Sequence, residues 1–347
     1  DHHTQDSVYA SGATTPSTVV NRRFDALGRL WQVLNAANQV VREYQYDAQG
    51  NLRRSQEHYS DTEHAITDYH SYDTLNRLTQ VTDALNGEST TSYDGADHIA
   101  SVTDARNNRT DYSTDGLNNP LSETSSDRGV TQNTNYDPAG NLKNRLDARY
   151  YTATYNYDAL NRITSIDYQP SPMSPAPLSP ALRFNYRYDG NPNPSNANAV
   201  GHLSHSDDPT GSNDWNYDNE GRLQSKTQRT QGIDLISRYA YDSGTGRLNG
   251  FTYPSGATLY YQYDTAGRIN AVRYSANAQT TEHVIVDNIT YQPLGAMTSY
   301  RLPTVTGQPS FSRVYDADGY LTHYTLNEGD VTLVRDRQGN IHQSNHV

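Results

Sequence analysis

A seven-residue motif recurs along the chain and constrains its fold more than any other feature. The motif runs aromatic residue, Asp, two variable residues, then Gly, Asn or Asp, one variable residue, and Leu or Ile, as in Phe24–Leu30 and Tyr46–Leu52. Nine copies share this frame, and most steps, degenerate copies included, are 20 to 26 residues long. A period of this length is typical of an array in which each repeat is one supersecondary unit stacked on its neighbours.

The chemistry of the motif is that of a tight turn. Asp is favoured at the first turn position because its carboxylate accepts backbone N–H bonds, and the residue three positions later should be left-handed, which Gly, Asn and Asp tolerate best. The aromatic residue before the turn then faces the Leu or Ile after it across a hairpin. We therefore expect structural turn residues at Asp25, Gly28, Asp47, Gly50, Asp73, Asn76, Asp137, Gly140, Asp158, Asn161, Asp218, Gly221, Asp264, Gly267, Asp316 and Gly319.

A second turn signal lies halfway between motifs. Asp83 and Asp104 open turn-like segments, and a series of Asp residues from Asp73 to Asp158 recurs every 10 to 12 residues. Such spacing leaves strands of about six residues, as in an antiparallel meander. No segment predicts a helix. The sequence therefore predicts an all-β fold of tandem antiparallel β-hairpins.

The number of hairpins bears on how the sheet is built. About fourteen repeats give about 28 strands, a sheet on the order of 130 Å wide, whereas twisted open sheets rarely pass about ten strands without curling. The apolar fraction of 33% and the 29 Tyr residues suit a thin sheet with partly solvent-exposed side chains better than a thick hydrophobic core. We expect a curved, spiralled single-layer wall with one face lined by Tyr and Leu, in which residues 1–23 are a lead-in and residues 24–347 form the wall.

Two proline- and asparagine-rich stretches interrupt the pattern. Residues 170–180 hold five of the fifteen prolines, and residues 190–200 are rich in Asn and Pro. Because proline cannot donate to a central ladder, we expect loop insertions within residues 168–200. A proline ligand for a partner is the alternative to a stiff surface loop.

Composition excludes several classes of function. The net charge of −12 argues against a general nucleic-acid binder, which needs a positive surface. The chain has no cysteine, so it cannot form a disulfide, a thiol nucleophile or a Cys-ligated metal site. No apolar run is long enough to span a membrane, and the start, Asp1–Thr4, lacks the features of a signal peptide. We expect a segment of a longer protein.

The motif resembles the YD, or Rhs, repeat. Tyr157–Ile163, Tyr46–Leu52 and the linking Val81–Ala84 carry the resemblance, which covers the chain from about Phe24 to Ile341. Such repeats occur in bacterial Rhs proteins, in the B and C components of Tc toxin complexes, and in teneurins. The resemblance implies a hollow β-sheet shell that, in the bacterial members, encloses a C-terminal toxin. Tyr136–Leu142 superficially resembles the family's self-cleavage motif, but it stands in the ordinary repeat frame and is interpreted as a turn.

The residues that could carry other chemistry have structural explanations. Asp207 and Asp208 precede a Pro-Thr-Gly turn, and no stretch has the oxygen-ligand spacing of a calcium loop. His202 with His205, and His342 with His346, have spacings that could place two rings near a metal, but no third ligand is in sequence reach. The sequence predicts no catalytic residue, cofactor or metal, and no enzyme activity.

Two functions from different classes remain. The first is a structural shell segment of a Rhs/Tc-type protein that shields a polypeptide toxin or effector cargo. Its partners would be the cargo, the remaining shell segments and a delivery machinery, and its location would be secreted or at the bacterial cell surface, by way of a specialised secretion system. The second is a cell-surface adhesion or carbohydrate-binding module that uses Tyr and Asn as sugar platforms.

Overall fold

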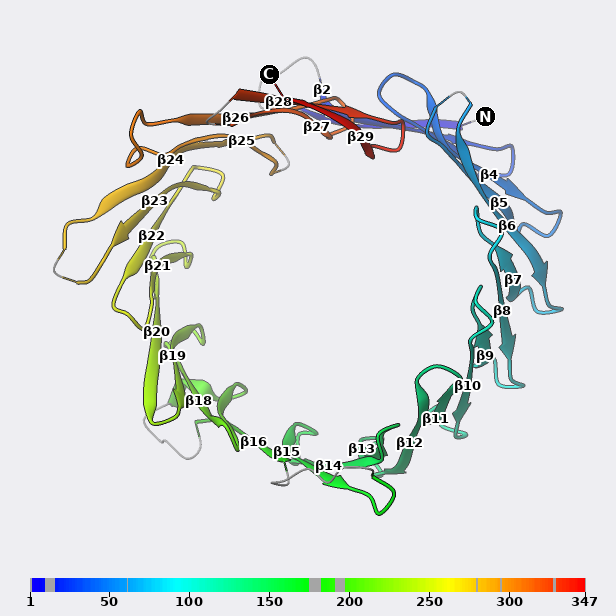
Figure 1. Cartoon of the computed structure of the whole chain (residues 1–347), viewed down its shortest axis with the longest axis horizontal. Helices are drawn as coiled ribbons and strands as arrows, with labels where there is room; N and C mark the ends of the chain where they lie inside the picture. The colour runs from blue at the N-terminus through cyan, green and yellow to red at the C-terminus, as the bar shows by residue number, and fades with distance from the viewer. Residues whose placement is uncertain are drawn as a thin grey trace. The chain divides into compact units, whose positions relative to one another are not determined.

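A computed structural model of the chain shows an almost all-β protein (Figure 1). It describes residues 2–9, 16–60, 62–174, 182–190, 197–278, 280–293, 295–326 and 329–346. Within these residues there are 29 strands and one turn of 3-10 helix, η1 (Ala197–Ala199). The strands are β1 (His2–Tyr9), β2 (Pro16–Phe24), β3 (Leu30–Leu34), β4 (Val40–Tyr46), β5 (Leu52–His58), β6 (His64–Tyr72), β7 (Leu78–Thr82), β8 (Glu88–Tyr93), β9 (Ile99–Thr103), β10 (Arg109–Thr114), β11 (Pro120–Ser125), β12 (Gly129–Tyr136), β13 (Leu142–Leu146), β14 (Tyr151–Tyr157), β15 (Ile163–Pro170), β16 (Leu182–Tyr188), β17 (Leu203–Asp208), β18 (Gly211–Tyr217), β19 (Leu223–Thr230), β20 (Ile233–Tyr241), β21 (Leu248–Thr252), β22 (Thr258–Tyr263), β23 (Ile269–Ser275), β24 (His283–Tyr291), β25 (Met297–Arg301), β26 (Ser310–Tyr315), β27 (Leu321–Leu326), β28 (Gly329–Arg335) and β29 (Ile341–His346).

Strands that follow one another in the sequence pair antiparallel. β14 pairs with β15 from Tyr151↔Pro170 to Tyr157↔Ile163, and β15 pairs in turn with β16. The register shifts just before the motif tyrosine, for example between Asn156 and Tyr157, which marks a β-bulge at the entry to the turn. The predicted fold class, tandem antiparallel β-hairpins in an open sheet, is confirmed.

Little of the chain is fully buried. Among the described residues, the buried apolar side chains are Leu34, Ala153, Ala199, Ala271 and Val331. Most strand residues are half-buried on both faces of the sheet. A sheet without a second layer leaves its side chains in this state, so stability must come from contacts between neighbouring strands and turns.

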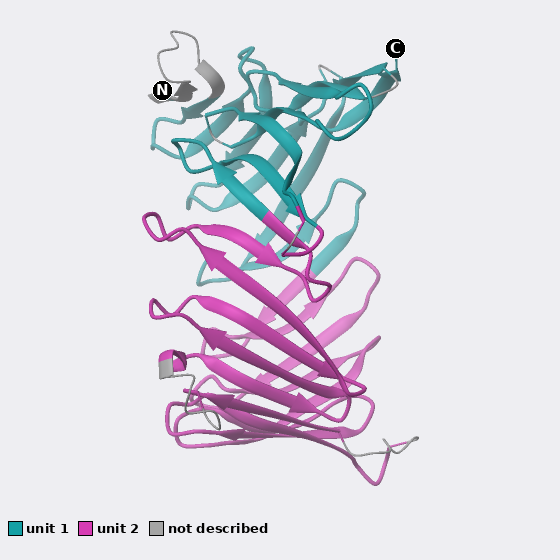
Figure 2. Ribbon diagram, turned by 90° about the vertical axis from the view of Figure 1, so that its left-hand side faces the viewer, with its two compact units in different colours: residues 1–89, 260–275, 281–347 teal, residues 90–259, 276–280 magenta. Residues whose placement is uncertain are grey.

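The chain divides into two compact units (Figure 2). Unit 1 comprises residues 1–89, 260–275 and 281–347, and unit 2 comprises residues 90–259 and 276–280. Unit 2 is a curved antiparallel sheet. Unit 1 joins the first strands of the chain to the last ones, which lie alongside one another in Figure 1.

The expected insertions at residues 168–200 fall partly outside the described residues, since residues 175–181 and 191–196 are not described. Within the same range, β15 continues to Pro170, and Leu182–Tyr188 forms β16, which pairs with β15 and β17. The single helical turn η1 follows. The repeat frame therefore continues through this stretch of the chain.

Candidate functional site

The Asp of each motif organises its turn through one carboxylate oxygen. In the turn after β14, Asp158 Oδ1 accepts the backbone N–H bonds of Leu160 and Arg162 at 2.9 and 3.0 Å. The N–H of Asn161 donates to the Asp158 carbonyl at 3.1 Å, and Asn161 has a left-handed φ of 62°. The turn is thus closed by both the side chain and the backbone of a single Asp.

The other expected turn residues lie in the same arrangement. Asp25, Asp47, Asp73, Asp137, Asp218, Asp264 and Asp316 each accept a backbone N–H bond from the residue four positions later. Positive φ angles are found at Gly28, Gly50, Asn76, Gly140, Gly221, Gly267 and Gly319. Asp137, in the segment that resembles a cleavage motif, has the geometry of every other turn.

A basic or amide side chain four positions after the Asp connects one turn to the next. Arg162 donates to Asp158 Oδ2 at 2.7 Å and, with its other nitrogens, to both carboxylate oxygens of Asp189 in the following turn, at 2.6 and 3.1 Å. Asn141 likewise reaches Asn161 of the next motif at 2.8 Å. The Arg162 guanidinium and the Gly201 amide lower the pKa of Asp189 to about 2.

The motif tyrosine carries a second connection between repeats. The Tyr157 hydroxyl donates to the carbonyl oxygen of Leu142, the last residue of the preceding motif, at 2.8 Å. The same bond is made by the pairs Tyr46–Leu30, Tyr72–Leu52, Tyr188–Ile163, Tyr217–Leu203, Tyr241–Leu223, Tyr291–Ile269 and Tyr315–Met297. We call this series the hydroxyl ladder.

The last repeat shows that the bond matters more than the residue that makes it. Arg335 takes the place of the motif tyrosine, and its Nε donates to the Leu321 carbonyl at 2.9 Å. In other repeats the Arg of one turn lies over the tyrosine ring of the next, as Arg162 does over Tyr188 at 4.3 Å. At four steps of the array, such as that from Arg162 to Tyr188, a hydroxyl bond and a cation–π contact together join neighbouring repeats.

Sequence reasoning treated the motif tyrosine as a packing residue and left the hydroxyl ladder unrecognised. The signal that could have found it is the preference for Tyr over Phe: the nine motif copies contain eight Tyr and one Phe, Phe24. A preference that keeps the hydroxyl indicates that the oxygen is used.

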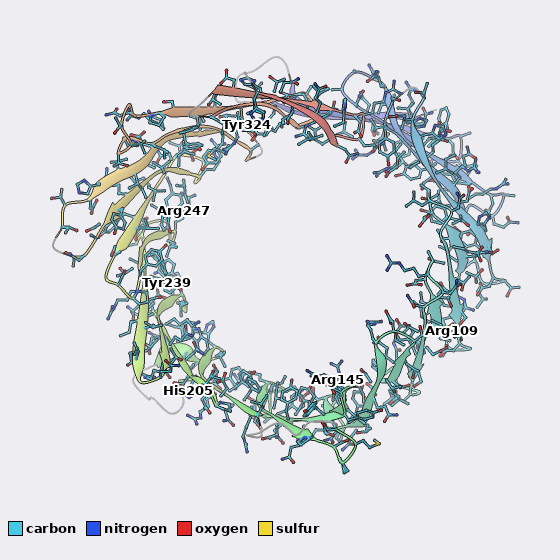
Figure 3. The ribbon with its side chains drawn as sticks, in the orientation of Figure 1. Arg109, Arg145, His205, Tyr239, Arg247 and Tyr324 are labelled. Atoms are coloured by element: carbon cyan, nitrogen blue, oxygen red, sulfur yellow. The ribbon has the colours of Figure 1, made fainter. Side chains whose placement is uncertain are left out.

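The two faces of the sheet differ in chemistry. In unit 2 one face carries the row Tyr155, Ile166 and Phe184, side by side across β14, β15 and β16. The next row on this face is Arg145, Ala153, Tyr168 and Leu182. We call it the aromatic face, and in Figure 3 the labelled Arg145 points from it to the concave side of the unit 2 sheet.

The opposite face of the same strands is polar. It carries the row Thr154, Asp167 and Arg183, in which Asp167 and Arg183 form an ion pair at 3.4 Å. His205 lies on this face, and its ring nitrogens contact Asp214 at 2.6 Å and Asp207 at 3.2 Å. The expected division of the sheet into a Tyr-lined face and a solvated face is thus present within unit 2.

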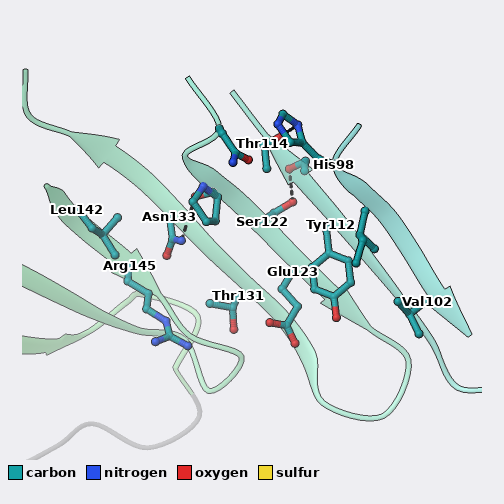
Figure 4. A pocket seen from close by; sticks show the side chains of 14 residues that line it. His98, Val102, Tyr112, Thr114, Ser122, Glu123, Thr131, Asn133, Leu142 and Arg145 are labelled. Atoms are coloured by element: carbon teal, nitrogen blue, oxygen red, sulfur yellow. Dashed lines mark hydrogen bonds between the residues drawn. The ribbon is translucent and has the colours of Figure 1, made fainter. Parts of the chain in front are cut away.

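A groove opens on the aromatic face across β9 to β13 (Figure 4). Its volume is about 680 Å³, and Tyr112, Glu123, Thr131, Asn133 and Arg145 are among its lining residues. Tyr112 is 38% exposed. Among the described residues, Asn133 Oδ1 is a buried oxygen without a hydrogen-bond partner. The groove offers an aromatic ring and both signs of charge to a bound chain.

Two of the histidines considered as metal ligands, His202 and His205, make other contacts. His202 stacks on Tyr217 with ring centroids 4.5 Å apart, whereas His205 is held between Asp207 and Asp214 in β17 and β18. His342 and His346 both belong to β29. In the part of the chain that the structure describes, no group of three or more His, Asp or Glu side chains could hold a metal ion.

These features define a class of protein: a single-layer array of turn-closed hairpins in which each repeat is bonded to the next. The family model described as RHS Repeat matches residues 72–109, and the model described as Teneurin YD-shell matches residues 193–346. The chain is a member of the YD/Rhs-repeat family, as the motif predicted. A comparison with curated protein sequences found no match.

Solved structures share the fold. The chain is similar to TcdB2-TccC3 in its crystal structure with Cdc42, with a TM-score of 0.76 and 18% identity over 93% of this chain. It is also similar to the Tc holotoxin pore of Photorhabdus luminescens, with a TM-score of 0.70 and 15% identity over 94% of this chain. The match covers 18% and 19% of those chains, so this chain spans about a fifth of their length.

Proposed function

We propose that the chain is a wall segment of a Rhs/Tc-type shell whose aromatic face holds a polypeptide toxin or effector cargo for delivery. The observation that carries the proposal is the division of one sheet into an aromatic face and a polar face, with no second layer over the aromatic face among the described residues of unit 2. An uncovered apolar face of this kind marks an interaction site.

The aromatic face suits a partner that is not a folded domain. Rows of half-buried Tyr and Phe, such as Tyr155 and Phe184, offer many weak and adaptable contacts to an extended chain. The groove adds polar groups that could bind a peptide backbone, among them Thr131 and Glu123. No helix in the described part of the chain is long and apolar enough to cross a bilayer.

The proposal includes the chain's place in the molecule. Residues 24–347 form the wall and residues 1–23 lead into it. The partners are the cargo and the other segments of the same shell, and the shell is secreted or displayed at the cell surface by a delivery machinery. The role is structural, which is what the shell-type family and the structural neighbours support.

The test uses the longest natural protein that contains this chain. A photo-crosslinking residue is introduced on one face of the unit 2 sheet at a time. Replacing Tyr155 or Tyr168 puts the probe on the aromatic face, and replacing Thr154 or Arg183 puts it two strands or fewer away on the polar face. We expect crosslinks to a cargo segment only from the aromatic face. Equal crosslinking from both faces would refute the proposal. Carbohydrate retained on the aromatic face in place of a polypeptide would favour the adhesion alternative.

A further inference from the structure

The array has two edges made of turns. The motif edge consists of the turns that begin at Asp25, Asp47, Asp73 and their equivalents up to Asp316 and Asp336. The mid-repeat edge consists of the turns between them, such as those that begin at Asn35, Tyr59 and Asp83. Each strand runs from one edge to the other, so the edges are separated by the length of a strand.

Within unit 1 the two edges bind each other. Asp318, in the motif turn after β26, accepts the backbone N–H of Ala36 at 2.7 Å. In the next motif turn, the Arg337 N–H donates to the Tyr59 carbonyl at 2.9 Å, and the Gln338 amide donates to the carbonyls of His58 and Val41. Motif turns from the end of the chain thus dock on mid-repeat turns from its beginning.

The contact uses one position of the turn. Asp318 and Gln338 both stand two residues after the motif Asp, which we call the tip position. These two side chains are half-buried, and burial raises the pKa of Asp318. At the tip position of earlier motif turns the side chain is exposed, as at Gln49, Ala139 and Glu220.

Four of the exposed tip positions carry leucine. Leu27, Leu75, Leu117 and Leu160 are 77, 63, 84 and 69% exposed. The turn itself does not need a leucine there, because Gln49, Ala139 and Glu220 occupy the same position in equally well-formed turns. A leucine held at the end of a rigid turn is an apolar contact group without a partner in the described chain.

We propose that the leucine-tipped motif turns of unit 1, those of Leu27 and Leu75, dock on the mid-repeat edge of a second copy of this chain. The occupant follows from the contact in unit 1, where this edge already binds a mid-repeat edge at the same turn position. The mid-repeat edge also carries an apolar tip, Leu85, which is 89% exposed.

Docking of unlike edges is heterologous, so copies associate head to tail, into a ring or an open chain. The surface is independent of whatever the aromatic face binds. A failure here leaves the cargo proposal untouched, and the reverse also holds.

Because the chain has no cysteine, single introduced cysteines can report which edges of two copies face each other. Leu75→Cys marks the motif edge and Leu85→Cys marks the mid-repeat edge at the other end of β7, a strand of five residues. Such a strand is about 17 Å long, so a disulfide between the two positions must join different copies. We expect mixed Leu75→Cys and Leu85→Cys chains to form a disulfide dimer on mild oxidation, and either variant alone to form at least about tenfold less.

Two matched double variants distinguish docking through the leucine tips from nonspecific hydrophobic association. Leu27→Gln with Leu75→Gln should reduce concentration-dependent association in sedimentation velocity by at least about tenfold, equivalent to ~1.4 kcal/mol. The control, Val314→Gln with Leu235→Gln, removes two exposed apolar side chains from strands, 50 and 38% exposed, and should leave association unchanged. Circular dichroism checks that both variants keep their sheet. A monomer at all concentrations, or single-cysteine variants that dimerise as well as the mixture, would overturn the proposal.

Discussion

A Tyr→Phe substitution removes a single hydroxyl group from the hydroxyl ladder and leaves the packing of the ring in place. Tyr157→Phe and Tyr217→Phe each remove a bond of 2.8 Å to a carbonyl of the preceding motif, that of Leu142 and Leu203 respectively. Removing one intramolecular hydrogen bond costs about 0.5–1.5 kcal/mol of net stability. The two tyrosines lie four strands apart, about 19 Å, so their effects should add to about 2 kcal/mol in the double variant.

Urea unfolding is the appropriate assay because the perturbation is small and local. Trp215 stands two residues from Tyr217 in β18 and reports on unit 2 by its fluorescence. Tyr253→Phe is the control: its ring is 42% exposed and packs edge-on against Phe251, with centroids 4.6 Å apart. We expect the double variant to unfold at a lower urea concentration with an unchanged slope, and the control to match the parent chain. A double variant that loses no more stability than the control would refute the role given to the ladder.

The remaining predictions concern the turns. Hydrogen bonds from the Arg162 backbone and guanidinium lower the pKa of Asp158, and the Asp189 pKa is lowered to about 2. A carboxyl whose pKa is depressed on folding contributes stability above its unfolded pKa and loses it as the pH falls through the folded pKa. Unfolding midpoints should therefore decline from about pH 4 downward, and Arg162→Gln should flatten that decline; an acid profile unchanged by the substitution would contradict the assignment. Gly140 has a φ of 83° and room for a methyl group, since the nearest atom to an added Cβ, Asn119 Oδ1, is 3.9 Å away. Gly140→Ala should thus cost the strain of a left-handed residue alone, about 1–2 kcal/mol, whereas Asn118→Gly, at the equivalent left-handed position of the preceding motif turn, should change stability by less than about 0.5 kcal/mol. Equal losses in the two variants would show that backbone strain does not set the residue at this position.

The sequence predicted the turns well because their chemistry is local. The Asp carboxylate and the left-handed residue three positions later act within one turn, so Asp158 and Asn161 could be assigned a geometry from spacing alone. The Tyr face also followed from alternation along strands. The contacts of Arg162 with Asp189, 27 residues on, could not be foreseen, because they depend on how far apart consecutive turns lie in space.

The contact between Ala36 and Asp318 shows a second limit. The two residues are 282 positions apart, and neither has a pattern that distinguishes it from its equivalents in other turns. In the sequence, Asp318 resembles any other polar turn residue. Its contact with Ala36 exists only because strands from the two ends of the chain lie next to each other. Pairings of this kind are set by the curvature of the sheet, which accumulates from strand twist over many repeats.

The bonds that link each repeat to the one before it have a consequence for how such chains change over evolutionary time. Because Tyr157 is bonded to Leu142 and Arg162 to Asp189, these hairpins carry their own connectors to their neighbours and need no central core. A hairpin can then be duplicated or deleted with the loss of only local bonds, as in other arrays with nearest-neighbour energetics. The length of the array can therefore vary freely, because a longer or shorter wall needs no new kind of contact.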